Sequence, residues 1–163
     1  MKRFTQLLTA LVFCSLIIFI SCKKKKGGED PDERDQVAAA IASNVWVPTS
    51  VEFDDANRTE WDGFSISFSY NNDSDVGSYT VSGVPTDDGA SDVWGENPSW
   101  TFAGTEEAPN TGTIVRTHDG IEMSAQLDNP DTPTVLTLTF SVEDPGARTA
   151  GFYGTWEFVL GPQ

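Results

Sequence analysis

The stretch FSISFSY, residues 64–70, carries an apolar side chain at every second position and a serine between each pair. Successive side chains of a β-strand point to opposite faces, so an apolar period of two predicts a strand with one buried and one solvated face. An amphipathic helix would repeat its apolar residues every three or four positions instead. Residues 64–70 are therefore predicted to form a half-buried strand.

Alternation of the same kind recurs along the rest of the chain. It is clearest in IEMSAQL (121–127), VLTLTFSV (135–142) and TWEFVL (155–160). Further strand candidates are residues 45–53, 77–82, 98–103 and 112–117, which makes eight strands. Short connections between half-buried strands favour sequential antiparallel pairing. We therefore expect an all-β fold, an eight-stranded antiparallel up-and-down β-barrel, with a two-sheet β-sandwich as the alternative.

Local signals refine this expected fold. Asp119-Gly120 is typical of a two-residue hairpin turn between the fifth and sixth strands. Pro48 has no amide proton to donate to a ladder, so we expect it at a sheet edge or a bulge of the first strand. Ahead of the strands, residues 35–43 predict a short helix with Asp35 as its N-cap.

The N-terminal segment has the layout of a secretory signal peptide. A short basic start is followed by a nearly unbroken apolar run from Leu7 to Ile20, and then by Ser21 and Cys22. The run covers about 14 residues, whereas a helix that spans a bilayer needs about 20. An uncleaved membrane anchor is the alternative interpretation of this segment.

The residues before Cys22 resemble the lipobox of bacterial lipoproteins. Ile20, Ser21 and Cys22 match its pattern, and Phe19 stands where leucine is usual. The resemblance implies cleavage before Cys22 and a diacylglycerol on the Cys22 sulfur. Lys23 rather than aspartate after the cysteine implies passage to the outer membrane. The four lysines depart from the acidic residues typical of surface display, which favours the periplasmic face and leaves the cell surface as the alternative.

The segment after Cys22 is predicted to be a tether. Residues 23–36 contain no apolar side chain, so they lack the means to form a core and we expect them to be disordered. The chain would thus comprise a lipoprotein signal peptide (1–21), a lipidated disordered tether (22–36) and a β domain (37–163).

Charge and cysteine content exclude several kinds of protein. The chain has a formal net charge of −15, and the part beyond residue 26 contains four arginines, no lysine and all 25 acidic residues. Nucleic-acid binding is excluded because no basic face exists to neutralise phosphates. The acidity is typical either of a saline habitat or of a domain kept soluble by its surface charge. Cys14 falls in the expected signal peptide and Cys22 is the expected lipid carrier, which leaves no thiol for a disulfide.

Residues 44–160 resemble the small lipocalin-like domains of Gram-negative envelope lipoproteins. The resemblance depends on the order of NVWVPTSVEF, WDGFSISFSY, VWGENPSWTF, IVRTHDGIEM, LTLTFSV and RTAGFYGTWEFVL. The larger lipocalin family has Gly-x-Trp in its first strand. Here that place reads Asn44-Val45-Trp46 without the glycine, and Gly154-Thr155-Trp156 lies in the last strand. The resemblance implies a cup for an apolar molecule, although the interior of a small barrel is also filled by side chains in many proteins.

Four aromatic residues are the candidate ligand contacts. Trp94 lies in residues 83–97, the longest stretch without strand alternation, where it would cover the barrel mouth, stack on a ligand or plug the barrel end. Phe152 and Tyr153, between two glycines, are a second candidate pair. Trp100 is in phase with an apolar strand face, which favours core packing over a binding role.

The sequence contains no pattern typical of catalysis or metal binding. It has no Gly-x-Ser-x-Gly elbow, no phosphate loop and a single histidine, His118. The oxygen-rich turn that begins at Asn71 lacks the glycine and glutamate of a calcium loop. We therefore expect no enzyme activity, no cofactor and no metal.

The expected function is that of a membrane-anchored envelope lipoprotein that binds an apolar or amphipathic small molecule without catalysis. The alternative is a structural or accessory subunit of an envelope complex, with a filled barrel and no ligand. A hydrolase that uses two carboxylates is a third hypothesis. The volume of the barrel interior separates the first two.

Overall fold

The computed structural model describes residues 32–86, 89–95, 98–105, 108–143 and 152–163. All of them belong to one compact unit, Pro31–Gln163. The predictions for the signal peptide, for Cys22 and for Lys23–Lys26 fall outside the described residues. Within the described part of the chain, no helix combines the length and the apolar character that a membrane crossing requires.

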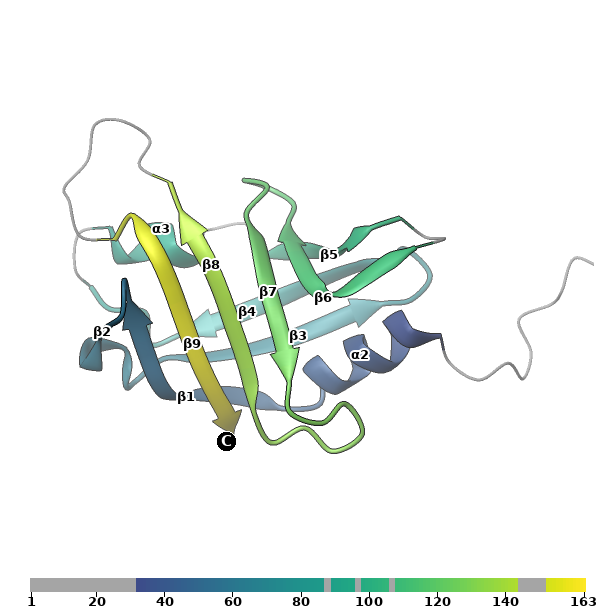
Figure 1. The fold of residues 1–163 in the computed structure, drawn as a ribbon, viewed down its shortest axis with the longest axis horizontal. Coiled ribbons are helices and arrows are strands. Elements are labelled where there is room, and N and C mark those ends of the chain that lie inside the picture. The colour runs from purple at the N-terminus through teal and green to yellow at the C-terminus, as the bar shows by residue number, and fades with distance from the viewer. Residues whose placement is uncertain (1–31, 87–88, 96–97, 106–107, 144–151) are drawn as a thin grey trace, which may run out of the picture. The chain divides into compact units, whose positions relative to one another are not determined.

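Eight antiparallel strands form a closed barrel, as the alternation of apolar residues predicts. They are β1 (Val45–Phe53), β3 (Ser65–Asn71), β4 (Val76–Ser82), β5 (Ser99–Gly104), β6 (Pro109–Arg116), β7 (Glu122–Leu127), β8 (Leu136–Val142) and β9 (Gly154–Pro162). Each strand pairs with the next in chain order, and β1 also pairs with β9 to close the barrel (Figure 1). The expected up-and-down barrel is confirmed, and the sandwich alternative is not the fold that forms. A short extra strand, β2 (Ala56–Asn57), extends the sheet beyond β1.

The closing seam between β1 and β9 contains the expected irregularity at proline. The pairing runs from Trp46↔Pro162 to Phe53↔Trp156, and the register shifts between Pro48 and Ser50. The shift is a β-bulge, which is where a residue without an amide proton fits in a ladder. The bulge prediction for Pro48 is therefore confirmed.

Strand alternation separates the core from the surface, and β3 shows it clearly. Ile66 and Phe68 are buried in the hydrophobic core. On the outer face, the hydroxyls of Ser65 and Ser69 lie 2.7 Å from those of Ser82 and Ser78 on β4. Cross-strand hydroxyl pairs of this kind satisfy polar groups where the face meets solvent.

The helix before the barrel begins earlier than the sequence predicts. Helix α2 spans Glu33–Ile41, and its N-cap is Asp32, whose side chain accepts a hydrogen bond of 2.8 Å from the Asp35 amide. The expected cap at Asp35 is wrong because Asp32 stands where its carboxylate reaches a free N–H group of the first turn. Part of the segment expected to be a disordered tether, Glu33 to Gln36, is therefore helical.

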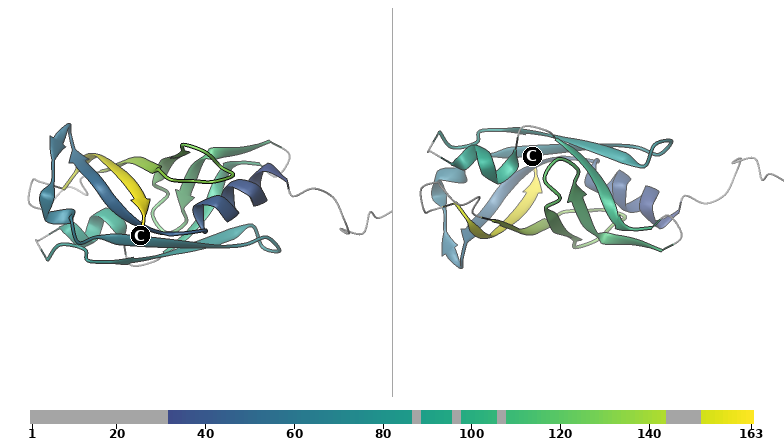
Figure 2. Two further views of the ribbon diagram at one scale, coloured as in Figure 1. Left: turned by 90° about the horizontal axis from the view of Figure 1, so that it is seen from below. Right: turned by 90° about the horizontal axis from the view of Figure 1, so that it is seen from above.

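Helix α2 packs against β3 and β6 at one end of the barrel (Figure 2). Its buried residues are Ala38, Ala40 and Ile41. The Ile41 carbonyl accepts a hydrogen bond of 2.8 Å from the Trp46 indole, which joins the end of the helix to the start of β1. This end of the barrel is therefore covered by the N-terminal helix.

Two further short helices lie at the opposite end of the barrel (Figures 1 and 2). They are the 3-10 helix η1 (Thr59–Trp61) and helix α3 (Ala90–Trp94). Helix α3 lies inside the segment 83–97, which has no strand pattern in the sequence. Neither helix is long enough to show an apolar period of 3.6 residues.

The hairpin between β6 and β7 differs from the expected two-residue turn. The Arg116 amide donates to the Ile121 carbonyl at 2.9 Å, and the Gly120 amide donates to the Arg116 carbonyl at 2.9 Å. Residues 117–120 therefore form a longer connection. Gly120 has a φ of 74°, a conformation that favours glycine, so the Asp-Gly signal marks the turn but not its length.

Candidate functional site

Aromatic side chains fill the barrel interior at the end that carries α3. We define the aromatic cluster as Trp61, Phe64, Trp94, Phe140, Trp156 and Phe158. Its rings come from η1, α3, β8, β9 and the start of β3. The ring centroids of contacting pairs are 5.2 to 6.0 Å apart, with edge-to-face, tilted and stacked geometries. These are the distances of rings in van der Waals contact, so side chains of the protein occupy this part of the interior.

Trp94 is the member of the cluster that α3 contributes. Its side chain is 1% exposed, and its ring stacks on Phe64 at a centroid distance of 5.3 Å. The Tyr79 hydroxyl donates a hydrogen bond of 2.6 Å to the Trp94 carbonyl. Burial raises the pKa of the Tyr79 hydroxyl, so the proton that it donates is retained at neutral pH. The structure places the Trp94 side chain in the barrel interior, among the other rings of the cluster.

Arg116 connects α3 to the barrel wall. It has no exposed surface, and its Nη1 donates a hydrogen bond of 2.5 Å to the Val93 carbonyl. Its Nε and Nη2 both donate to the Asp119 carboxylate, and its guanidinium lies 5.7 Å from the centre of the Phe140 ring. A buried cation needs such partners because desolvation disfavours its charge. Arg116 therefore has both a carboxylate and an aromatic ring as partners.

Two tryptophans in the aromatic cluster have indole N–H groups without a hydrogen-bond acceptor. Trp46, Trp100 and Trp156 each donate to a backbone carbonyl, at 2.8, 3.2 and 3.0 Å. By contrast, Nε1 of Trp61 and Nε1 of Trp94 are buried and have no partner. Leaving a buried donor unpaired costs about 1–3 kcal/mol, so these two atoms mark a locally unfavourable arrangement.

The other expected ligand contacts lie in two places. Trp100 is fully buried in a separate group of rings, with Tyr70 stacked on it at 5.4 Å and Phe102 at 5.2 Å. Phe152 is 9% exposed and stacks on Trp156 at 6.2 Å. The structure therefore brings Phe152 to the end that holds Trp94 and places Trp100 among other side chains.

Tyr153 and Arg58 make further contacts around Phe152 at the end of the barrel that carries α3. The Tyr153 hydroxyl donates a hydrogen bond of 3.4 Å to Asp92 of α3, and Tyr153 itself is half-buried. The guanidinium of Arg58 lies 5.2 to 5.4 Å from the ring centres of Phe53, Phe152 and Trp156. Cations over ring faces in this range are attracted by the ring quadrupole.

Trp61 is a member of the cluster that the sequence does not indicate. Trp61 precedes the alternating stretch, and nothing in its immediate neighbours indicates that η1 turns it into the interior. Its position follows from contacts with Phe158 at 5.3 Å and Trp156 at 5.4 Å, which lie far away in the sequence. No local signal in the chain reports such contacts.

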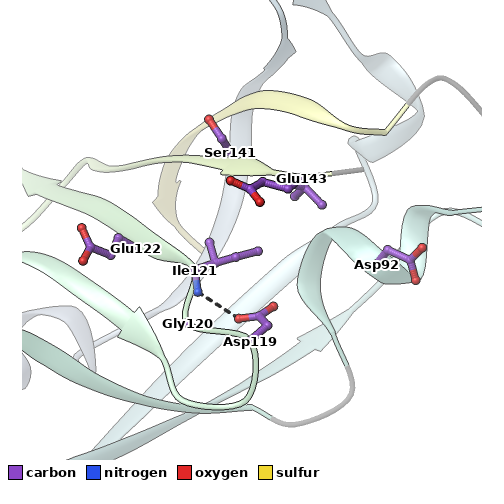
Figure 3. Close-up of a pocket in the computed structure, with 8 residues that line it drawn as sticks. Asp92, Asp119, Gly120, Ile121, Glu122, Ser141 and Glu143 are labelled. Atoms are coloured by element: carbon purple, nitrogen blue, oxygen red, sulfur yellow. Dashed lines mark hydrogen bonds between the residues drawn. The ribbon is translucent and has the colours of Figure 1, made fainter. Parts of the chain in front are cut away.

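An acidic hollow lies on the outside, next to α3. It has a volume of about 460 Å³. It is lined by Asp92, Asp119, Gly120, Ile121, Glu122, Ser141, Val142 and Glu143 (Figure 3). These residues come from α3, from the β6–β7 hairpin and from the end of β8. The Asp119 carboxylate accepts a hydrogen bond of 3.1 Å from the Ile121 amide, which fixes the rim of the hollow.

A second acidic hollow, of about 380 Å³, lies over β1, β8 and β9. It is lined by Glu52, Asp54, Asp55, Thr139, Thr155 and Glu157. Asp54 accepts a hydrogen bond of 2.9 Å from the Thr155 amide. Among the residues that the structure describes, no group of three or more His, Cys, Asp or Glu side chains is placed to hold a metal ion.

No family model, no curated protein and no solved structure matches this chain. The class is therefore defined by the fold and its interior: an eight-stranded antiparallel up-and-down β-barrel, with one end held by α2 and the other by α3. A barrel of this class is compatible with a ligand-binding module.

Proposed function

We propose that this protein is a lipid-anchored lipoprotein of the bacterial cell envelope, whose barrel is a non-catalytic accessory module that acts through its outer surface. The observation that carries the accessory role is the aromatic cluster, because its rings are buried and in mutual contact. In the described interior, the protein's own side chains occupy the place that a resident ligand would need. The expectation of a small apolar ligand is therefore the second candidate function.

One observation favours this second candidate. The unpaired indole N–H groups of Trp61 and Trp94 are donors in an apolar setting, which is the environment of a site that orients a small amphipathic molecule. Such a molecule would enter only if part of the aromatic cluster moved.

Anchoring is supported by the sequence around Cys22. The lipobox-like Ile20-Ser21-Cys22 follows an apolar run, and the lysines that follow would lie at lipid headgroups. We place the anchor in the outer membrane, with the barrel on the periplasmic face and with the cell surface as the alternative.

The charge distribution supports an envelope protein partner on the outside of the barrel. The side chains of Arg34, Arg58 and Arg116 are only 12%, 21% and 0% exposed, so the described arginines are turned toward rings and carboxylates. Acidic side chains remain at the surface around both hollows. Complementary charge speeds encounter with a basic protein surface, so the proposed partner is a protein with a cationic face.

Native mass spectrometry of the full chain, purified from its own host, tests the choice between the two functions. The accessory function predicts the mass of the protein with its lipid and nothing else in the barrel. A second small molecule bound in a one-to-one ratio would contradict the filled-barrel proposal and support the small-molecule function.

Intact-mass analysis of variants tests the anchor. We expect the wild-type protein and Cys14→Ala to carry diacylglycerol and to begin at Cys22, because Cys14 lies in the segment that would be removed. Cys22→Ala should lack the lipid, since it has no sulfur at the acylated position. A wild-type chain that starts at Met1 and carries no fatty acid would contradict the anchor.

A further inference from the structure

Trp61 and Trp94 face the same two rings of the barrel interior. The Trp61 ring lies 5.5 Å from Phe64 and 5.3 Å from Phe158, and the Trp94 ring lies 5.3 and 5.2 Å from the same two residues. Both indoles are at most 1% exposed, and both Nε1 atoms lack an acceptor. The other three tryptophans find backbone carbonyls. Two unpaired donors in one apolar cluster indicate a place that is suited to an oxygen acceptor.

Helix α3 carries Trp94 into this cluster on a short segment of 5 residues. It is bounded by Gly89 and Gly95, whose φ angles of 97° and 61° lie in the region that glycine adopts readily. Hydrogen bonds from barrel side chains hold its carbonyls, from the Tyr79 hydroxyl to Trp94 and from Arg116 Nη1 to Val93. Helix α3 belongs to no strand ladder, so its withdrawal would leave the pairing of the barrel strands intact.

The acidic hollow beside α3 supplies the route. Asp92 of α3 lines it, together with Val142, a member of the hydrophobic core (Figure 3). The hollow, of about 460 Å³, therefore borders α3 at the surface. Movement of α3 toward this space would also let the Trp94 indole N–H hydrogen-bond to water.

We infer that α3 is a removable plug, and that its withdrawal opens an interior site for a flat apolar molecule carrying at least one uncharged oxygen acceptor. This inference rests on the second candidate function. The flat body of the molecule takes the place of the Trp94 ring against Phe64 and Phe158. Its oxygen accepts from a donor left without a partner, either Arg116 Nη1 or Trp61 Nε1. The acceptor is uncharged because Asp119 already balances Arg116, and a second buried carboxylate would have no counter-charge.

The test uses the full chain in lipid nanodiscs and the neutral naphthyl ketone dye prodan, with empty nanodiscs as the blank. Dimethylaminonaphthalene, which has the same flat body without the ketone, is the matched probe. We expect saturable binding of prodan to the protein, weaker binding of the ketone-free probe, and faster amide hydrogen exchange in the peptide that covers α3 when prodan is bound. Faster exchange in one segment on ligand binding is the signature of a displaced plug.

Two tyrosine variants separate the plug from other modes of binding. Tyr79→Phe removes the hydroxyl that holds the Trp94 carbonyl, so the open state becomes more populated and prodan should bind about threefold to tenfold more tightly. Tyr70→Phe also removes a hydroxyl, but that hydroxyl donates to Asp75 rather than to α3, and binding should be unchanged.

The outcomes distinguish the inference from the function on which it rests. Saturable binding that is equal in both variants, with no faster exchange in α3, would overturn the plug and leave a small-molecule function standing. The absence of saturable prodan binding to the wild type and to Tyr79→Phe would overturn both the plug and the second candidate function.

Discussion

Arg116 and Asp119 are the residues for which substitution tests the structure most directly. The guanidinium of Arg116 has no exposed surface, whereas the Asp119 side chain is 29% exposed. Removing the carboxylate leaves a buried cation, but removing the cation leaves an acid that water reaches. The two halves of this ion pair should therefore differ in the cost of their loss.

We expect Asp119→Ala to lower the free energy of unfolding by about 3–5 kcal/mol, because it leaves the buried charge of Arg116 without its counter-ion. Arg116→Met should cost less, since methionine is apolar and Asp119 is left with solvent access. Urea unfolding measures both. Glu122→Ala, an exposed acid of the same hairpin, is the control and should change stability by less than about 0.5 kcal/mol. An equal cost for the two halves would contradict the one-sided burial.

The carboxylate of Asp128, in the connection between β7 and β8, accepts several hydrogen bonds. Hydrogen bonds from the Thr134 hydroxyl, then from the amides of Val135 and Thr134, lower its pKa from 3.8 to about 2. A lowered pKa in the folded state means that the charged form contributes stability above the unfolded pKa of 3.8. This contribution should be lost as the pH falls from about 4 to about 2.

We expect Asp128→Asn to be less stable than the wild type at neutral pH, and this difference should shrink as the pH falls from about 4 to about 2, because protonation disables the carboxylate in the wild type. Chemical unfolding at a series of pH values measures the effect. The exposed Asp131→Asn is the control and should follow the wild type. A difference between Asp128→Asn and the wild type that does not depend on pH would contradict the assigned pKa.

Among the secondary-structure elements, α2 is one whose existence the sequence predicts but whose first residue it leaves ambiguous. The segment contains acidic residues at positions 32, 33 and 35, and each is a plausible start for a short helix. Only the observed side-chain contact of Asp32 with the Asp35 amide identifies the cap.

We expect Asp32→Ala to lower stability by about 1 kcal/mol, because it removes an N-cap acceptor. Asp35→Ala should have a much smaller effect, since its loss of favourable charge near the helix start is offset by the better helix propensity of alanine. Thermal unfolding compares the two variants. A larger loss for Asp35→Ala would support the cap predicted from the sequence instead.

The barrel strands could be predicted from sequence because each has a local signature, whereas the short helices η1 and α3 could not. In β3 and β8 alternation alone shows which residues face inward, and at Pro48 the missing amide proton indicates a bulge. Trp61 and α3 are placed by contacts with residues distant in the chain, among them Phe158. The candidate site was therefore predicted in part: Trp94 and Phe152 from their irregular surroundings, but not Trp61 or the connection that Arg116 makes to α3.

On the level of the whole chain, net charge opposes folding. The formal net charge is −15, and the described arginines are turned inward. Like charges on a compact surface repel each other more than they do in an extended chain, so folding works against this repulsion.

We expect the melting temperature to rise when NaCl increases from about 0.01 to about 1 M, because the screening length falls from about 30 Å to about 3 Å. Circular dichroism at the β-sheet band measures it. KCl should produce the same rise, whereas a rise with sulfate alone would indicate exclusion of the salt from the protein surface rather than screening. No change with either chloride would contradict the importance of self-repulsion.

The β1–β9 seam has a consequence for folding during synthesis of the chain. The ladder that completes the ring joins Trp46 to Pro162, so residues from both ends of the folded unit must be present together. While a ribosome is still adding β9, the edge of β1 has no partner and the cylinder stays open. Closure of the barrel must therefore wait until synthesis has passed β9.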